Sequence, residues 1–214
     1  DRGVVYLGMD FYPAGEIDVT PQVSRFADMG ADWIFTNHIQ GAPICKAIVD
    51  LGLKGEVHFC ANMACFSEDI PDSAGEDAEG EYGMHHLAFL SEQDLPGVKA
   101  LRNAVSKYYP GARQTVATAD GWNYGWVIET AIKLALEEKG YPITGEDFIR
   151  IVNSADGKGA WAETGGIIPA LDFTSDPRDA TGTHQVRIGQ ILNGELVPIT
   201  KWLDVPHLSY LAVE

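Results

Sequence analysis

Histidine and cysteine side chains in the first hundred residues are of the types that ligate metals. Six of them could be considered as one zinc site: His38, His58, Cys60, Cys65, His85 and His86. Only His58 and Cys60 lie close in sequence, and no Cys-x-x-Cys or His-x-x-x-His pair of the kind found in zinc sites accompanies them. We therefore expect core and loop residues here, and no metal site.

Nucleophilic catalysis has even less support than metal binding. No Gly-x-Ser-x-Gly elbow is present, and Cys45 falls within a predicted helix face, where burial makes a thiol inert. The acidic run at residues 69–81 is typical of a solvated helix face rather than a calcium site. Cys60 and Cys65 form a local disulfide or stay as two buried thiols; three cysteines do not decide this. We expect no catalytic residue, no cofactor and no enzyme activity.

Composition limits the function classes. The chain has 214 residues, 15 Lys and Arg against 31 Asp and Glu, and a net charge of −16. Such acidity argues against a protein that tracks nucleic-acid phosphates or docks on anionic lipid. A hydrophobic content of 45% is enough for a packed core, and no apolar run approaches the ~20 residues needed to span a bilayer.

Short apolar runs alternate with amphipathic stretches through the first half, which is typical of a mainly parallel sheet flanked by helices. The expected strands are residues 4–12, 32–35, 56–60 and 81–84. The expected helices begin near residues 20, 43 and 70, and a fourth, marked by Val98, Leu101 and Val105, ends near Pro110-Gly111. The pattern then changes. Residues 121–139 predict a long helix with Trp122, Trp126, Ile132 and Leu136 available for burial, and Thr144 with Asp147 predicts a capped helix directly after it. Asn193-Gly194 predicts a hairpin.

Four segments together resemble one family. They are residues 10–23 (DFYPAGEIDVTPQV), 29–35 (MGADWIF), 74–80 (AGEDAEG) and 164–169 (TGGIIP), the last continuing through Gly182 to the strand 184–191. In order and spacing they are similar to the leucine/isoleucine/valine-binding type of periplasmic solute-binding protein, which has the type I flytrap fold. The resemblance implies an α/β fold of two lobes, each a mainly parallel sheet flanked by helices and joined by crossover strands.

The resemblance also implies how the chain divides. Residues 3–112 and 183–202 correspond to most of the C-terminal lobe, residues 119–175 to a portion of the N-terminal lobe, and residues 112–118 and 176–182 to the crossovers. Family members are nearly twice as long, so we expect a fragment lacking the N-terminal part, with a short relative as the alternative. A strand and helix absent from the sheet would leave an exposed edge and an uncovered apolar face.

The expected ligand contacts lie beyond the carboxyl ends of the strands, where ligands bind in open α/β sheets. The loops are residues 36–40 and 61–66, with His85-His86 as a further candidate. The resemblance implies a polar or aromatic contact at Asn37 or His38, and a position at Ala61 or Asn62 that in the family often carries an acid for an amino-acid ammonium. Met63 and Trp122 complete the candidate set, although Trp122 also suits core packing. Because no carboxylate occupies the second position, a neutral or carboxylate-bearing ligand fits as well as a branched-chain amino acid.

By resemblance, the expected function is capture of a small molecule by hinge closure and its delivery to an ABC permease in the membrane. The protein would be periplasmic or extracellular, with the signal peptide outside this chain. The alternative is a ligand-sensing regulator or receptor domain on the same fold, and a weaker one is an unrelated α/β enzyme. A signal peptide in the upstream reading frame would favour transport.

Overall fold

The computed structural model describes residues 3–13, 15, 17–37, 41–154, 164–173 and 182–205. The chain forms two compact units, Asp1–His85 with Ile188–Ile199 and His86–Arg187 with Thr200–Glu214. The division falls inside one strand, between Arg187 and Ile188. The lobe boundaries expected from the sequence remain a prediction, and the predicted crossover at residues 176–182 lies outside the described residues except for Gly182.

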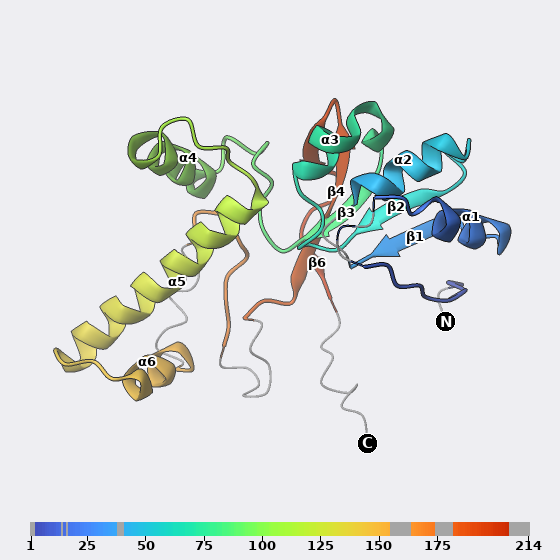
Figure 1. Cartoon of the computed structure of the whole chain (residues 1–214). Helices are drawn as coiled ribbons and strands as arrows, with labels where there is room; N and C mark the ends of the chain where they lie inside the picture. Colours follow the sequence, from blue (N-terminus) through green and yellow to red (C-terminus); the bar gives the residue numbers. More distant parts are fainter. Residues whose placement is uncertain are drawn as a thin grey trace, which may run out of the picture. The chain divides into compact units, whose positions relative to one another are not determined.

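The first unit is an α/β unit (Figure 1). Its strands β1 (Trp33–Thr36), β2 (His58–Ala61) and β3 (Tyr82–His85) pair in parallel, β1 with β2 and β2 with β3. Next in the sheet comes β4 (Gln185–Leu192), whose part from Ile188 onwards belongs to this unit, followed by the antiparallel β5 (Glu195–Pro198). The expected α/β fold with a mainly parallel sheet is thus present here.

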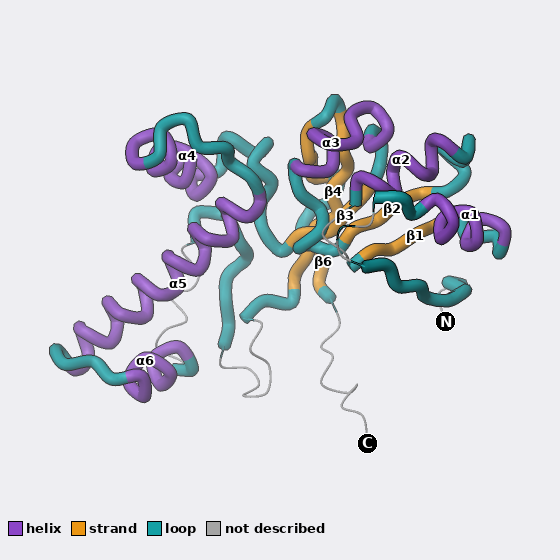
Figure 2. The backbone as a smooth tube through the Cα atoms, viewed as in Figure 1, coloured by secondary structure: helices purple, strands orange, loops and turns teal. Residues whose placement is uncertain are grey.

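Helices connect these strands. They are α1 (Thr20–Asp28), α2 (Ala42–Asp50), α3 (Asp69–Ala74) and the 3₁₀ turn η1 (Gly75–Ala78). Figure 2 shows α2 and α3 over the same face of the sheet. Their expected C-terminal glycines are present, because Gly30 and Gly52 follow α1 and α2 with φ of 83° and 72°, a region that only glycine adopts freely.

The core of the first unit lies between α2, α3 and the covered face of the sheet. Phe59, Phe66 and Ile70 are fully buried there. Gly83 lets Phe66 lie against β3, since a β-carbon at this glycine would come within 2.1 Å of Phe66 Cγ. Gly41 is similarly restricted by Phe59 and Ile70. The absence of a β-carbon at these two glycines leaves the space that the Phe59, Phe66 and Ile70 side chains fill.

Glu81 is a buried acid that ties several parts of this unit together. Its side chain is 2% exposed, and its carboxylate accepts hydrogen bonds from the Phe59 N–H (2.7 Å) and from Lys54 Nζ (3.2 Å). Lys54 Nζ also donates to the Asp77 carbonyl (2.7 Å), and the Glu81 carbonyl accepts from the Ile191 N–H (2.9 Å). A buried carboxylate needs such partners, so this network is structural.

The opposite face of the sheet carries an aromatic row. Trp33, His58 and Tyr82 lie on successive strands, with ring centroids of Trp33 5.0 Å from His58 and 5.2 Å from Tyr82. Trp33 and Phe35 are 50% and 58% exposed. Alternation along each strand therefore buries one face under helices and leaves this aromatic face partly exposed.

The predicted strand at residues 4–12 is wrong. No strand is assigned between residues 3 and 13, and Val4, Tyr6 and Phe11 are all more than three-quarters exposed. The sequence has strand propensity, but a strand also needs a hydrogen-bonded neighbour, and within the described residues β1 pairs with β2 alone. Propensity without a partner leaves the segment irregular.

The second unit is built from helices and loops. Its helices are α4 (Pro96–Tyr108), α5 (Val116–Lys139) and α6 (Gly145–Val152), and the start of β4 pairs antiparallel with β6 (Leu203–Asp204). Helix α5 begins five residues before the predicted start, because Thr115 and Thr118 form a capping box there. The predicted capping box of Thr144 and Asp147 is confirmed at α6.

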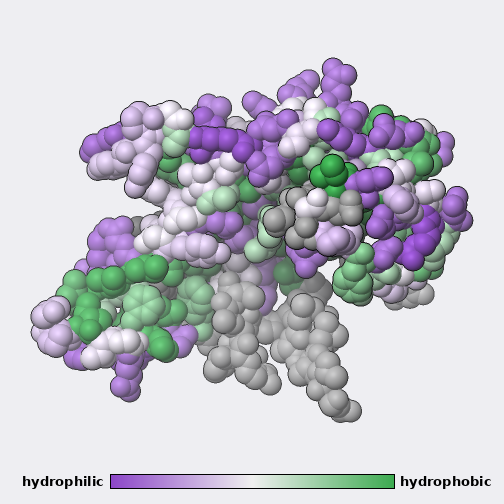
Figure 3. All heavy atoms as spheres, in the orientation of Figure 1, coloured by the Kyte–Doolittle hydropathy of each residue, from purple (hydrophilic) through white to green (hydrophobic). Residues whose placement is uncertain are grey.

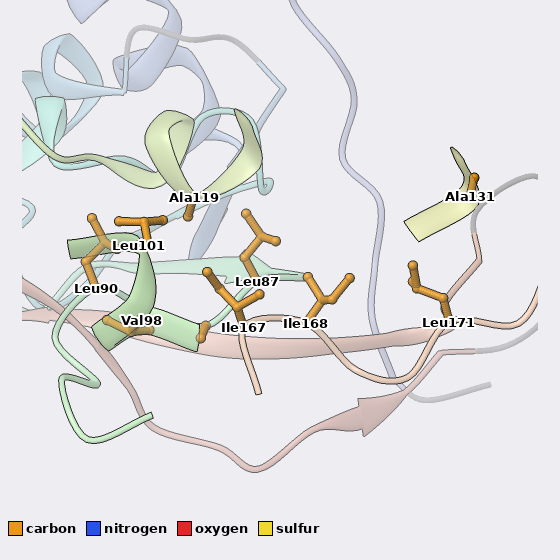
Figure 4. Packing of buried hydrophobic residues seen from close by; sticks show 10 residues of the cluster. Leu87, Leu90, Val98, Leu101, Ala119, Ala131, Ile167, Ile168 and Leu171 are labelled. Atoms are coloured by element: carbon orange, nitrogen blue, oxygen red, sulfur yellow. The ribbon is translucent and has the colours of Figure 1, made fainter. Parts of the chain in front are cut away.

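The core of this unit is an apolar cluster between α4, α5 and two loop segments (Figure 4). It contains Leu87, Ala88, Leu90, Val98, Leu101, Ala119, Ala131, Ile167, Ile168 and Leu171. The loops are joined by a hydrogen bond from the Ala88 N–H to the Ile167 carbonyl (2.7 Å). Gly97 and Gly165 allow a close backbone contact beside this cluster, with the Gly97 N–H donating to the Gly165 carbonyl (2.8 Å).

Helix α5 buries small residues and exposes large ones. Ala119, Ala131 and Ala135 are fully buried, whereas Tyr124, Ile128, Ile132 and Leu136 are 40–59% exposed and recur every four residues. The expected burial of Ile132 and Leu136 is therefore wrong. Figure 3 shows hydrophobic side chains gathered over the part of the molecule that holds α5 and α6. Nothing in the described residues of the second unit covers the exposed stripe of α5.

Candidate functional site

Asn37 and Asn62 are joined at the ends of two neighbouring parallel strands. Asn37 directly follows β1, and Asn62 directly follows β2. The Asn62 Nδ2 group donates a hydrogen bond to Asn37 Oδ1, and the Asn62 N–H donates to the Thr36 carbonyl (3.1 Å). Thr36 and Ala61, the last residues of β1 and β2, lie opposite each other, so the two strands end at the same level of the sheet. The structure thus places two of the predicted ligand residues side by side.

The loop after β2 presents the rest of this edge. The N–H groups of Cys65 and Phe66 donate to the Asn62 carbonyl (3.0 and 2.9 Å), so residues 62–66 form one tight turn. Met63 is 42% exposed on it. Asn62 Oδ1 is buried and accepts no hydrogen bond from the described residues. The edge therefore offers an apolar side chain beside an unpaired amide oxygen.

The remaining predicted residues lie elsewhere. His38 is outside the described residues. Ala61 is fully buried on the helix-covered face of the sheet, so its methyl group is directed into the core. Trp122 belongs to the second unit, where it is half-buried and packs against the apolar cluster. Of those predicted residues that the structure describes, Asn37 and the loop that begins at Asn62 are the ones it brings together.

Tyr12 is a residue of this region that sequence reasoning did not single out. Burial raises the pKa of its phenol, a hydrogen bond with the Thr36 side chain partly offsets the rise, and nearby Cys65 adds to it. Tyr12 therefore lies beside the last residue of β1. Its position at the end of the apolar run 4–12 is the sequence signal that could have indicated it.

The two histidines after β3 have different surroundings. His85 is 1% exposed, and its Nε2 lies 3.2 Å from the Phe66 carbonyl, which makes it a core residue of the first unit. His86, in the second unit, has its Nε2 3.5 Å from Asp120 Oδ1. Burial lowers the pKa of His86 while Asp120 partly offsets this. Burial also raises the pKa of Asp120 while His86 partly offsets that.

The cysteines are all free thiols in this structure. Burial, with a further contribution from the charge of Glu81, raises the pKa of Cys45 to about 12 and that of Cys60 to about 11. Thiols with such pKa values are poor nucleophiles at neutral pH. Across the described part of the chain, no three His, Cys, Asp or Glu side chains are grouped so as to hold a metal ion. Among the same residues, none of the helices is both long and apolar enough to traverse a membrane.

Comparison with solved structures identifies the fold. A branched-chain amino acid ABC transporter protein from Thermus thermophilus with bound valine matches with a TM-score of 0.79 and 23% identity, over 94% of this chain and 53% of that one. A solute-binding protein from Rhodopseudomonas palustris HaA2 in complex with p-hydroxybenzoic acid matches with a TM-score of 0.69 and 23% identity, again over 94% and 53%. This chain spans about half the length of these proteins.

A third solved structure is also similar in fold. The fatty acid ABC transporter substrate-binding protein of Thermomonospora curvata matches with a TM-score of 0.71 and 21% identity, over 89% of this chain and 48% of that one. No curated protein sequence matches significantly. The sequence model of the periplasmic binding protein family matches residues 1–195. The type I periplasmic-binding fold expected from the sequence is thus confirmed, and the chain belongs to the periplasmic binding protein family.

Proposed function

We propose that the protein is the solute-binding component of an ABC transporter, which captures a small molecule and delivers it to a membrane permease. The observation that carries this proposal is the family match over residues 1–195. The solved relatives named above are ABC transporter proteins, two of them with bound valine or p-hydroxybenzoic acid. Neither delivery nor binding requires a bond to be made or broken, in keeping with the poorly nucleophilic Cys45 and Cys60 thiols.

Capture is proposed to occur by hinge closure of two lobes, with residues 3–112 and 183–202 in one and residues 119–175 in the other. Residues 112–118 and 176–182 would be the crossovers. A ligand shifts such a protein toward its closed form only by its differential affinity for that form. The proposed location is the periplasm or the extracellular space.

The ligand is proposed to be an amino acid or a small carboxylate or aromatic acid. The Asn37–Asn62 pair supplies neutral amide groups, and Met63 supplies apolar contact surface. A neutral amide accepts or donates hydrogen bonds without demanding a charged partner, so this edge suits either class. His38 and Ala61 remain candidates on the strength of the family resemblance, and Trp122 remains a candidate in the second unit.

Calorimetric titration of the whole chain with L-leucine, L-valine and 4-hydroxybenzoate tests this function. Binding of one of them, weakened about fivefold or more by Asn62→Ala, would support the proposal because a hydrogen bond to the ligand is lost. The matched control is Asn103→Ala, at an exposed position of α4, and it should leave binding unchanged. If neither these solutes nor a wider panel of amino acids and carboxylic acids produces heat or raises the unfolding temperature, the proposal is wrong.

A further inference from the structure

The turn between β4 and β5 consists of Asn193 and Gly194, a pair of residues that can react with each other. Alone among the chain's asparagines, Asn193 is followed by glycine. In such a pair the glycine nitrogen attacks the side-chain amide carbon of the asparagine. The nitrogen loses its proton to the solvent, ammonia leaves with a proton from the solvent, and a cyclic succinimide forms. Water then opens the ring to aspartate or isoaspartate. Both residues are exposed, so water reaches them.

The carboxylate of Glu79 holds both backbone N–H groups of this turn. Its Oε1 accepts a hydrogen bond from the Asn193 N–H (2.8 Å), and its Oε2 accepts one from the Gly194 N–H (3.2 Å). Successive backbone N–H groups can form a concave site for an anion, and here the anion is a side chain of the same unit. The nitrogen that would attack is therefore already the donor of a charge-assisted hydrogen bond.

Backbone hydrogen bonds fix the position of Glu79 beside the turn. The Gly80 N–H donates to the Ile191 carbonyl (2.8 Å), and the Ile191 N–H donates to the Glu81 carbonyl (2.9 Å). The Gln190 side chain adds a hydrogen bond to the Gly80 carbonyl (2.8 Å). The segment that carries Glu79 is thus paired with β4 directly before the turn, and the sheet itself holds the carboxylate in place.

This contact opposes the reaction in two ways. The attacking nitrogen must lose its proton, and a carboxylate that accepts from the Gly194 N–H stabilises the protonated form and repels the negative charge that develops. Ring closure also turns that nitrogen towards the Asn193 side chain, which rotates a peptide unit of the turn. The hairpin resists this rotation, because Leu192 and Glu195 are paired across it and its two central residues adopt φ of 54° and 76°.

We propose that Asn193 is a deamidation site that Glu79 keeps closed in the folded protein, so that it reacts only when the β4–β5 turn opens. The product carries a further carboxylate next to Glu79, and isoaspartate lengthens the backbone of the turn by a methylene group. Both changes oppose reclosure, since like charges repel and a tight hairpin turn has no room for an added backbone atom. The modified residue therefore records past openings. This proposal does not depend on the proposed function.

Peptide mapping by mass spectrometry measures the conversion of Asn193 during incubation of the whole chain at mildly alkaline pH. The reference is the same chain unfolded in urea at the same pH. We expect the folded chain to react at least about tenfold more slowly, because only the open fraction reacts. Equal rates in the folded and the unfolded chain would overturn the proposal.

Glu79→Ala tests the role of the carboxylate. It should accelerate conversion in the folded chain about tenfold, because charge-assisted hydrogen bonds are lost, and leave the rate in urea unchanged. Glu79→Gln keeps an acceptor oxygen without the charge, so its rate should fall between the two; it also provides the test if Glu79→Ala does not fold. The matched control is Glu76→Ala, which removes an exposed acid of the neighbouring η1 turn and should leave the rate unchanged.

Hydrogen exchange separates opening of the turn from a general loss of stability. In the Glu79 variants, exchange of the Gly194 N–H should accelerate more than exchange of the amides of β2. The proposal is wrong if neither Glu79 variant reacts faster than the unaltered chain, if Glu76→Ala accelerates conversion equally, or if exchange in β2 rises as much as at Gly194.

Discussion

The two units differ in the side chains that their helices bury. In the first unit, Phe59, Phe66 and Ile70 are enclosed between helices and one sheet face. In the second, α5 buries alanines and leaves Ile128, Ile132 and Leu136 half exposed. The first unit therefore has a core of large side chains in close contact, whereas the long helix of the second contributes only its narrow face. This difference shows that hydrophobic residues form a core only where another layer of helices or strands packs against them.

The largest expected effect is at Gly83 in the first unit. Gly83→Ala would place a β-carbon 2.1 Å from Phe66 Cγ and 2.3 Å from Cδ2, so the fully buried ring or the strand must move. We expect a loss of about 3 kcal/mol in the free energy of unfolding, measured by urea denaturation. Hydrogen exchange should accelerate in β2 and β3 before it does in α5.

Gly125→Ala is the matched control for that substitution. A β-carbon at Gly125 meets nothing within 4 Å, and the residue lies inside α5. Alanine should therefore stabilise the helix by about 0.5–1 kcal/mol. If both glycine variants were equally stable, the tight Phe66 contact would be wrong.

Leu101→Ala tests the core of the second unit. Leu101 is fully buried in the cluster with Ile167 and Leu171, and its truncation leaves a cavity. We expect a loss of about 2–3 kcal/mol, at the low end of such substitutions because loop segments on one side can relax. Region-resolved hydrogen exchange should show the change in α4 and α5. An effect spread equally over β1 and β2 would mean that the two units unfold as one.

Glu81→Gln has a smaller expected effect. The amide still accepts from the Phe59 N–H, but the ion pair with half-exposed Lys54 is lost. We expect a loss of about 1–2 kcal/mol in thermal or urea unfolding. Lys54→Gln removes the other partner and should lose less, because Glu81 keeps its backbone donor. A larger loss in the lysine variant would contradict this assignment of roles.

The smallest effect on stability is expected on the exposed stripe. Ile128→Lys should change the free energy of unfolding by less than about 0.5 kcal/mol, since Ile128 is 51% exposed. Light scattering should show less self-association, because an apolar patch is interrupted. Ala131→Lys, the control on the buried face of the same helix, should instead clearly lower the free energy of unfolding of the second unit. Equal tolerance of both substitutions would contradict the two-faced description of α5.

The sequence predicted the local elements well. The strands near residues 33, 58 and 82, the glycine ends of α1 and α2, the capping box at Thr144 and the hairpin at Asn193-Gly194 all follow from short-range rules of propensity and capping. Asn193 and Gly194 adopt φ of 54° and 76°, as a tight hairpin turn requires. The loops after β1 and β2 were predicted for the same reason, because strand ends can be read from periodicity, whereas Asn37 and Asn62 within those loops were indicated by the family resemblance.

Only the tertiary structure decided which residues have partners. Among the residues that the structure describes, residues 4–12 have strand propensity but no neighbouring strand to pair with, and Ile132 and Leu136 have the spacing of a buried face but no layer that covers them. The proximity of Asp120 to His86 joins residues 34 positions apart, which no local pattern encodes. The amino-acid sequence fixes short-range hydrogen bonds and periodicity, whereas pairing, burial and the environment of a charge depend on contacts between distant segments.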